Sequence, residues 1–208
     1  MAKLRVQRIS YGDAYPWIKR KHYAKRVPSM SYIFGLFEDH ILIGVVSFGK
    51  PPSPDVCNCI CGIDFRNNVL ELNRLVLDGG KNHASFLISN AMKELPKETI
   101  VISYADTGMS HIGYIYQASN FIYTGMSKEK MDRYDPNNPS KHSRSCSGEN
   151  FPKKLRTAKH RYIYFVGSSG WKKRMIRDHL KLPILEYPKG ELGSYDASFS
   201  PNVQMVMF

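Results

Sequence analysis

The sequence contains no long hydrophobic run. No segment approaches the roughly 18 consecutive apolar residues that a membrane-spanning helix requires, and residues 1–10 lack the apolar centre of a secretory signal. Internal repeats are also absent. We therefore expect a cytoplasmic protein without a membrane partner. Its 208 residues predict a single domain, residues 1–208, with a polar and basic insertion at about residues 126–159.

Cysteines are few, and none stands in a pair with metal-ligand spacing. The chain has four, Cys57, Cys59, Cys61 and Cys146. A zinc site would favour CxxC pairs or nearby histidines, so reduced structural thiols are a better interpretation than zinc or a disulfide. If residues 57–61 are extended, the three cysteines of this run share one face.

Acidic residues are scarce beside basic ones. Asp and Glu number 18 and Lys and Arg number 30, for a net charge of +12. The positive charge lies in residues 1–28 and 126–189, whereas residues 29–125 are slightly acidic. Clustered cations favour a nucleic-acid partner, and the alternative is a solvated basic face. The predicted DNA contacts are Lys19, Arg20, Lys21, Lys25, Arg26, Lys153, Lys154 and Arg156.

The residues between Leu70 and Phe121 predict the central unit of an α/β fold. A strand at 70–77, a helix at 84–95 and a strand at 99–104 follow from apolar periodicity, and so short a crossover predicts neighbouring parallel strands. A short helix lies within 107–121. Outside this unit we expect strands at 4–9, 31–37, 41–48, 121–125 and 160–166, helices at 13–21 (capped by Asp13) and 171–180, and a loop at 49–68.

The turn before the central helix is a candidate anion site. Gly79, Gly80 and Lys81 precede a helix N-terminus, where free N–H groups and the helix dipole favour a group such as pyrophosphate. The alternative is that the glycines only turn the chain. Ser85, on the first helical turn, is an anion contact or a cap. Arg74 either pairs with Glu71 or Asp106 or contacts a phosphate or carboxylate of the donor.

The order of predicted elements resembles that of the GNAT (acyl-coenzyme A N-acyltransferase) fold. The resemblance implies a mixed central sheet flanked by helices, with a coenzyme A donor whose pyrophosphate lies at the central helix N-terminus. The GNAT signature [RQ]xxGx[GA] is matched only loosely by residues 78–84, DGGKNHA.

A narrower resemblance is carried by LELNRLVL, by Asn82 to Ser85, by SYADTGMSHIGYIYQASNFIYTG and by KHRYIYF. These segments are similar to those of phage Mom-type DNA modification proteins, and the similarity extends from His22 to about Pro188. It implies conversion of adenine in phage DNA to N6-carbamoylmethyladenine, which protects the DNA from host restriction. It also implies that His22, Tyr23, Asp106 and Tyr116 form the active site.

The implied reaction sets chemical requirements. Adenine N6 lies inside the duplex, so the base must be turned out of the stack at a cost of a few kcal/mol. Tyr23, Tyr104, Tyr114 and Tyr116 are candidates to replace the lost stacking. Asp106 or His22 could accept the N6 proton, and Tyr116 could protonate the leaving group.

The donor is the open part of this chemistry. Attack of N6 on the thioester of acetyl-CoA would give an amide, whereas a carbamoylmethyl group is joined through a CH₂ carbon. Another small donor or a second activation step is then required. A bound metal would help, and His22, Tyr23, Asp106 and Tyr116 offer N and O ligands suited to iron. The alternative is that His22 and Tyr23 contact DNA while Asp106 caps the next helix.

Three functions are therefore compared: a Mom-like DNA adenine modifier, which we favour, an ordinary acetyl-CoA-dependent N-acetyltransferase acting on a protein or small amine, and a non-catalytic DNA-binding module. The partners considered are DNA, a small-molecule donor and a second copy of the chain.

Overall fold

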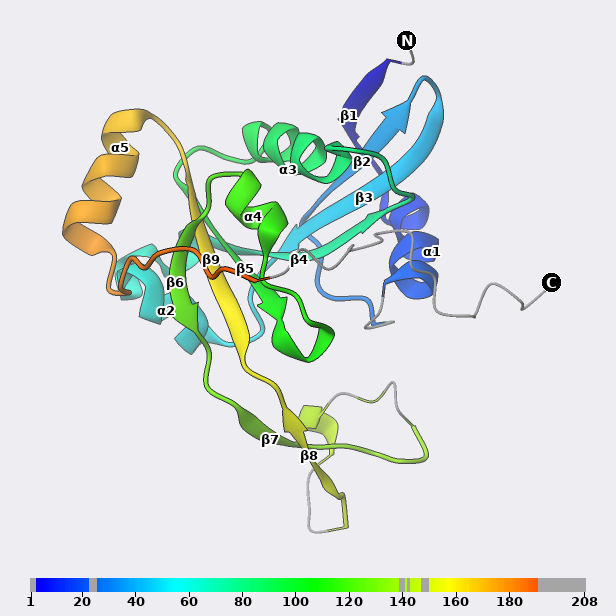
Figure 1. Ribbon diagram of the computed structural model, residues 1–208, viewed down its shortest axis with the longest axis vertical. Helices are drawn as coiled ribbons and strands as arrows, with labels where there is room; N and C mark the ends of the chain where they lie inside the picture. Colours follow the sequence, from blue (N-terminus) through cyan, green and yellow to red (C-terminus); the bar gives the residue numbers. More distant parts are fainter. Residues whose placement is uncertain (1–2, 23–25, 139–140, 142, 147–149, 191–208) are drawn as a thin grey trace, which may run out of the picture.

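A seven-stranded mixed sheet forms the body of the protein, and a separate two-stranded ribbon extends from it (Figure 1). The computed structural model describes residues 3–22, 26–138, 141, 143–146 and 150–190. The strand order is β1-β2-β3-β4-β5-β9-β6, with β7-β8 as the ribbon. The strands are β1 (Leu4–Arg8), β2 (Tyr32–Glu38), β3 (Ile41–Gly49), β4 (Val69–Leu77), β5 (Thr99–Asp106), β6 (Ile122–Met126), β7 (Lys130–Arg133), β8 (Lys153–Arg156) and β9 (Lys159–Val166).

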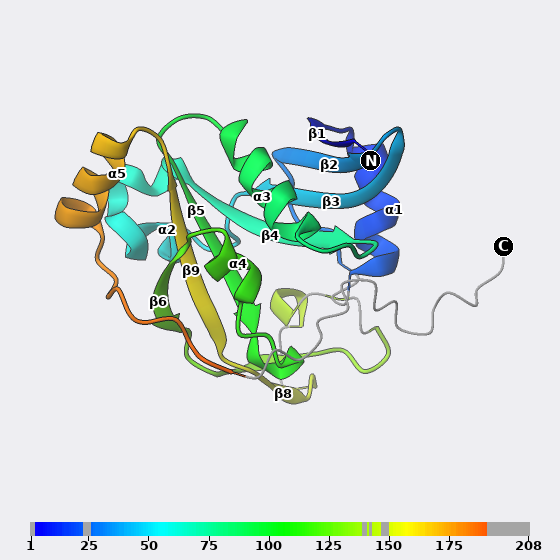
Figure 2. The same ribbon diagram turned by 45° about the horizontal axis from the view of Figure 1, so that its top comes forward.

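Helices cover both faces of the sheet (Figure 2). Helices α3 and α4 pack on one face, α1 on the other, and α2 and α5 beside it on that second face. The α-helices are α1 (Tyr11–Lys21), α2 (Pro54–Cys61), α3 (His83–Lys93), α4 (Tyr114–Ala118) and α5 (Ser169–Arg174). The 3₁₀ helices are η1 (Ile63–Asn68), η2 (Thr107–Met109) and η3 (Ser143–Ser145), and η4 (Met175–His179) is a π-helix that follows α5. The predicted α/β class, a mixed sheet flanked by helices, is confirmed.

The largest apolar cluster lies under α3. Leu87, Ile88 and Ala91 are fully buried against side chains of β2, β3 and β4 such as Leu36 and Phe48. The i, i+1, i+4 spacing places these three residues on one stripe of the helix, as the sequence periodicity predicts. Burial of this stripe holds α3 across the sheet and so fixes where its N-terminus lies.

Strands β4 and β5 run parallel, as predicted, but they pair only over a short stretch. The ladder between them runs from Val69 opposite Ile100 to Glu71 opposite Ile102. Beyond it, β4 continues to Leu77 and β5 to Asp106. The strands therefore separate toward their carboxyl ends, which are the ends where ligands gather in α/β sheets.

Two local predictions are wrong. Residues 49–68 are not a loop, because they contain α2 and η1. The cysteine run is consequently helical rather than extended: Cys57 and Cys61, four residues apart, are buried, whereas Cys59 is exposed. Asp13 is not the N-cap of α1; Ser10 is, and Asp13 completes its capping box from the third helical position.

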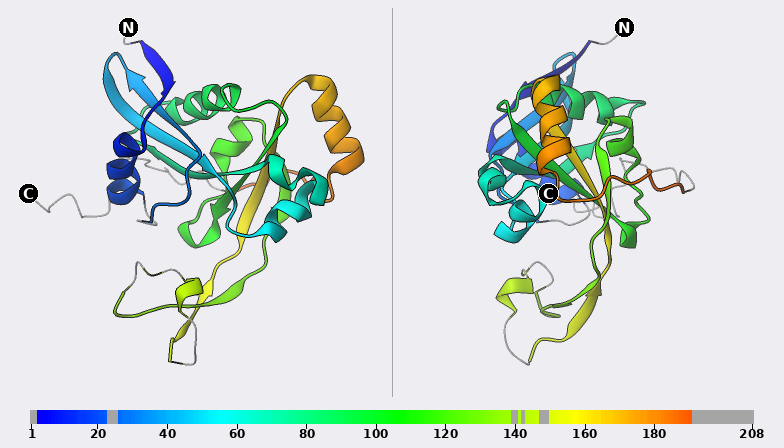
Figure 3. Two further views of the ribbon diagram at one scale, coloured as in Figure 1. Left: turned by 180° about the vertical axis from the view of Figure 1, so that it is seen from behind. Right: turned by 90° about the vertical axis from the view of Figure 1, so that its left-hand side faces the viewer.

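The polar and basic insertion predicted at about residues 126–159 contains two strands, β7 and β8. Strands β7 and β8 pair antiparallel from Lys130 opposite Arg156 to Arg133 opposite Lys153. Figure 3 shows this ribbon projecting beyond the sheet in two further views. It continues the direction of β6 and β9, so the chain enters and leaves the ribbon beside the end of β5.

Candidate functional site

A cleft of about 1510 Å³ opens where β4 and β5 separate. Its lining comes from β4, β5, the start of α3, α4, α2 and the ribbon. The predicted site residues that line it are His22, Arg26, Arg74, Gly79, Gly80, Asp106, Tyr116, Lys154 and Arg156. The cleft therefore brings together residues that are far apart in the sequence.

One face of the sheet changes from apolar to polar as it enters the cleft. In β5, Ile100 and Ile102 belong to a buried apolar cluster, and Tyr104 and Asp106 follow on the same face because strand side chains alternate. Strand β9 carries Arg161 opposite Tyr104 and Lys159 opposite Asp106. Alternation thus lines this face of the cleft with polar groups.

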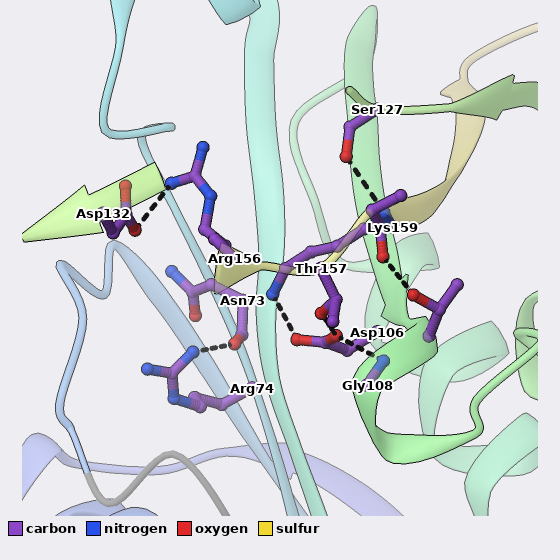
Figure 4. A network of polar contacts seen from close by, with 11 residues as sticks. Asn73, Arg74, Asp106, Gly108, Ser127, Asp132, Arg156, Thr157 and Lys159 are labelled. Carbon is purple, nitrogen blue, oxygen red and sulfur yellow. Dashed lines mark hydrogen bonds and ion pairs between the residues drawn. The ribbon is translucent and has the colours of Figure 1, made fainter. Parts of the chain in front are cut away.

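Asp106 lies at the end of β5 and accepts three hydrogen bonds (Figure 4). Its Oδ1 accepts from the Gly108 backbone N–H at 3.0 Å and from Thr157 Oγ1 at 2.6 Å. Its Oδ2 is 2.7 Å from Lys159 Nζ. The Gly108 contact makes Asp106 the N-cap of η2, so its predicted capping role is observed.

These partners set the charge of Asp106. Burial raises the pKa of its carboxyl, but the hydrogen bonds from Lys159, Thr157 and Gly108 more than offset this, and the pKa lies below its ordinary value. Asp106 is therefore ionised at neutral pH and is a weak proton acceptor. Its geometry suits orientation of a partner group.

Glu71 is a second carboxylate in the cleft, and its surroundings differ. Burial raises its pKa, and the charges of Arg74 and Lys159 oppose that rise. Within the described part of the chain, no hydrogen bond or ion pair to its carboxylate is recorded. Tyr104 is near it on the same face, and burial followed by the Glu71 charge raises the pKa of the phenol. A carboxylate with a raised pKa is better suited to accept a proton than Asp106 is.

His22 follows the last residue of α1 and is 9% exposed. Burial, the charge of Arg74 and the neighbouring His111 and Lys159 lower its pKa to about 3. The ring is thus neutral at physiological pH. Burial also lowers the pKa of His111, which Asp106 opposes. Lys159 thus influences the pKa of both His22 and Asp106. His111 influences the pKa of His22 and is itself influenced by Asp106.

Arg74 and Asn73 connect β4 to the segment that follows α1. Arg74 Nε and Nη2 donate to the Arg26 carbonyl at 3.1 and 2.8 Å, and Asn73 Nδ2 donates to the Ser29 carbonyl at 2.9 Å. Asn73 lies at a β-bulge against β3, where Ser47 pairs with Arg74. At this bulge both side chains reach the segment that follows α1. Arg74 is thus held at the cleft wall, and its predicted contact with the donor stays a prediction.

Tyr116 lines the cleft from α4, on the face opposite Tyr104. The centroid of its ring lies 5.4 Å from the ring centroid of Phe121 and 5.3 Å from that of Tyr162. Gly113 is the N-cap of α4 and has φ +83°, and a Cβ there would lie 2.3 Å from Tyr162 Cε2. Only glycine fits, so the packing of Gly113 on Tyr162 sets the position of Tyr116.

The predicted anion turn leads into α3. Gly79 and Gly80 both have positive φ, and the Gly80 position is closed to a side chain by the His83 ring. The N-cap Asn82 is left-handed and makes no side-chain cap, and Ser85 Oγ donates to the Asn82 carbonyl. Lys81 is exposed. Anion binding by Gly79, Gly80, Lys81 and Ser85 stays a prediction.

The predicted DNA contacts fall in two places. Lys19 and Arg20 are exposed on α1, whereas Lys21 forms an ion pair with Asp78 and lies 3.9 Å from the Trp17 ring centroid. Arg26 is exposed. Lys153, Lys154 and Arg156 are exposed on β8. Tyr23 and Lys25 lie outside the described residues.

The residues that the structure describes do not support the predicted iron site. Among the described residues no group of three His, Cys, Asp or Glu side chains is placed to hold a metal. Both oxygens of Asp106 already accept hydrogen bonds. Tyr23, one of the four predicted ligands, is not among these residues.

Sequence reasoning missed several residues at the site. Thr157 and Lys159 lie in or beside the predicted insertion, no sequence pattern pointed to His111, and Glu71 was predicted only as a possible partner of Arg74. The signal that could have found Lys159 is the pairing of the strand at 160–166 with β5, which places it opposite Asp106. Thr157 could not be found this way, because it lies outside that strand.

Comparison with known proteins decides the family. The sequence model of the Mom protein family matches residues 3–189. This chain belongs to the Mom protein family. A curated relative, the methylcarbamoylase mom of Escherichia phage Mu, is 35% identical over 130 residues, which are 59% of this chain and 54% of that protein. The match thus spans about half the length of that curated relative.

Solved acetyltransferases are among the structures to which this Mom family chain is similar. The ribosomal-protein-S5-alanine acetyltransferase from Vibrio fischeri superposes with a TM-score of 0.46 at 12% identity, over 80% of this chain and 94% of that one. A putative acetyltransferase from Salmonella typhimurium, solved with acetyl-CoA, has a TM-score of 0.46 at 10% identity, over 78% of this chain and 93% of that one.

Among the described helices, none is long and apolar enough to cross a membrane.

Proposed function

We propose that this protein is a DNA-modifying transferase that converts adenine to N6-carbamoylmethyladenine in phage DNA, inside the host cytoplasm, and so protects that DNA from restriction. One observation carries the proposal: a single cleft joins the Asp106 network to the root of a basic ribbon. The ribbon supplies cations for a polyanion, and the cleft supplies proton-handling groups. Family membership and the name of the phage Mu relative support it.

The two faces of the sheet suggest how the reactants meet. We assign the base to the face that carries Glu71, Tyr104 and Asp106, because the ribbon and α1 border it. We assign the donor to the opposite face, where Tyr116 and the N-terminus of α3 lie. The separated ends of β4 and β5 then form the opening through which N6 reaches the donor carbon.

The reaction forms an N6–CH₂ bond and breaks the bond from that carbon to a leaving group. Glu71 takes the N6 proton, Tyr116 protonates the leaving group, and Asp106 orients the amine. Direct attack on acetyl-CoA would instead give an amide. The donor is therefore a small molecule activated at a CH₂ carbon, or acetyl-CoA changed by a second activation step, and its anionic part lies at Gly79 and Gly80.

Nucleoside mass spectrometry tests the proposal. The protein is expressed in bacteria, and plasmid DNA is digested and searched for an adenosine of increased mass. We expect carbamoylmethyladenosine with the wild type and its loss with Asp106→Ala. Asp64→Ala, which removes an exposed carboxylate from η1, is the matched control and should not change the yield.

Other products would change the conclusion. N6-acetyladenosine would retain DNA as the substrate but replace the carbamoylmethyl product with simple acyl transfer. Unmodified DNA in cells that contain folded protein would refute DNA modification under these conditions and favour an acetyltransferase with another acceptor.

A further inference from the structure

The ribbon exposes two large apolar side chains. Met131 on β7 and Leu155 on β8 are 57% and 56% exposed, and they are cross-strand partners in the ribbon. Cross-strand partners project from the same face of a two-stranded ribbon. The ribbon therefore presents one paired apolar patch.

Positive charge surrounds this apolar pair. Five of the eight residues in β7 and β8 are Lys or Arg and one is Asp. Arg156 pairs with Asp132 at 3.4 Å, and Lys154 lies 5.2 Å from the Tyr134 ring centroid. A single exposed apolar side chain is ordinary on a protein surface, but a central apolar pair with cations on both sides matches a polyanion that has an apolar interior.

The ribbon extends beyond the body of the protein, so the pair covers no core there (Figure 1 and Figure 3). Leu155 nevertheless lines the same cleft as Asp106, together with Lys154 and Arg156. An isolated two-stranded ribbon is only marginally stable in water. Burial of both side chains against a partner would stabilise it.

Duplex DNA fits these features. The major groove of the duplex accepts a two-stranded ribbon, and the phosphates match the cations. Proteins that bend DNA from the minor groove show that Leu or Met can insert between base steps. On the basis of the proposed function, we propose that Met131 and Leu155 form an apolar wedge that enters the base stack beside the target adenine and fills the space left when that base turns into the cleft.

The test measures base extrusion without a donor. Duplexes carry 2-aminopurine, a fluorescent adenine analogue, in place of adenine in every nearest-neighbour context. A second set places an abasic site opposite 2-aminopurine, so that the base is already unpaired. The full chain is titrated with both sets, and binding and fluorescence are recorded for the wild type and for Met131→Ala/Leu155→Ala.

We expect the double variant to lose the fluorescence increase and to bind the paired duplex at least about tenfold more weakly, a loss of about 1.4 kcal/mol. Its affinity for the unpaired set should stay within about twofold of the wild type, because extrusion then costs less. Leu155→Met keeps an apolar side chain and should behave as the wild type. Ile41→Ala, at a 71% exposed site at the start of β3, is the control for loss of an exposed apolar group.

Three results would overturn the wedge. Equal weakening on both sets would mean that the pair contacts DNA without opening it. Unchanged binding and fluorescence would mean that the patch serves another partner, such as a protein. Failure of the wild type to bind any duplex would refute the proposed function itself, not only the wedge.

If the circular dichroism spectrum of the double variant differs from that of the wild type, Leu155→Ser takes its place in both titrations, and the same results are expected.

Discussion

Replacement of Thr157 by valine should destabilise the protein in a pH-dependent way. Valine keeps the shape of threonine but removes the 2.6 Å hydrogen bond to Asp106 Oδ1. A hydrogen bond to a charged group contributes about 1.5–3 kcal/mol. The Asp106 side chain is 15% exposed and keeps its contacts to Lys159 and Gly108, so we expect the lower end, about 1.5 kcal/mol. For a chain of this size that is a fall in Tm of about 3–6 °C.

The pH dependence identifies the cause. The folded-state pKa of Asp106 lies below its ordinary value of 3.8. Its ionised form therefore contributes stability that is fully present above that value and is lost as the pH falls through the folded-state pKa. Thr157→Val should raise the folded-state pKa toward the ordinary value. The difference between wild type and variant should thus be largest at neutral pH and shrink in acid.

Urea unfolding at pH 7 and at successively lower pH measures this difference. Thr107→Val, which removes a 2.7 Å hydrogen bond to the Ala158 carbonyl nearby, is a matched control that involves no carboxylate. Its penalty should not depend on pH. A Thr157→Val penalty that is constant with pH, or below about 0.5 kcal/mol at pH 7, would refute our account of the Asp106 network.

Three further predictions concern DNA affinity, ionisation and chemistry. Lys153→Ala/Lys154→Ala should reduce the slope of log affinity against log salt by about 0.9 for each phosphate that the variant no longer neutralises, whereas Lys97→Ala, at an exposed site beyond α3, should leave it unchanged in anisotropy titrations. The ring of His22 should stay neutral from pH 5 to 8 by NMR, since its pKa is about 3. An unfolded histidine protonates near 6.5, so stability should fall below that pH by up to about 1.4 kcal/mol per unit relative to His22→Gln. Glu71→Gln should lower adenine modification about a hundredfold or more with unchanged DNA affinity, and retention of activity would exclude Glu71 as the proton acceptor.

The regular elements of the body follow from local sequence patterns. The apolar spacing in α3 and the β-branched run of β5 each predict an element that the structure contains. The order strand, helix, hairpin, strand, helix, strand, helix, strand, insertion, strand is observed as well, with α2 added. Helix α2 was missed because three nearby prolines indicate a loop, yet Pro54 occupies the first helical turn, where proline is tolerated.

The site is only partly encoded by local pattern. Asp106 could be found because it ends a recognisable strand. Thr157 is 51 residues away along the chain, and only the tertiary fold brings its hydroxyl to Asp106. The ribbon was missed because its strands are mostly charged and offer no alternating apolar pattern to detect. The predicted single domain and the possible homodimer stay predictions.

Two of the three donors to Asp106, Thr157 and Lys159, lie in the short segment that forms the root of the ribbon. Ser127 and Lys159 join the two sides of this root by reciprocal bonds, Ser127 N to the Lys159 carbonyl at 2.8 Å and Lys159 N to Ser127 Oγ at 3.0 Å. Thr157 and Lys159 therefore lie where the ribbon joins the body. If binding at the ribbon shifts either residue, it changes the pKa of Asp106, and by thermodynamic reciprocity protonation of Asp106 then changes the affinity of the ribbon for its ligand.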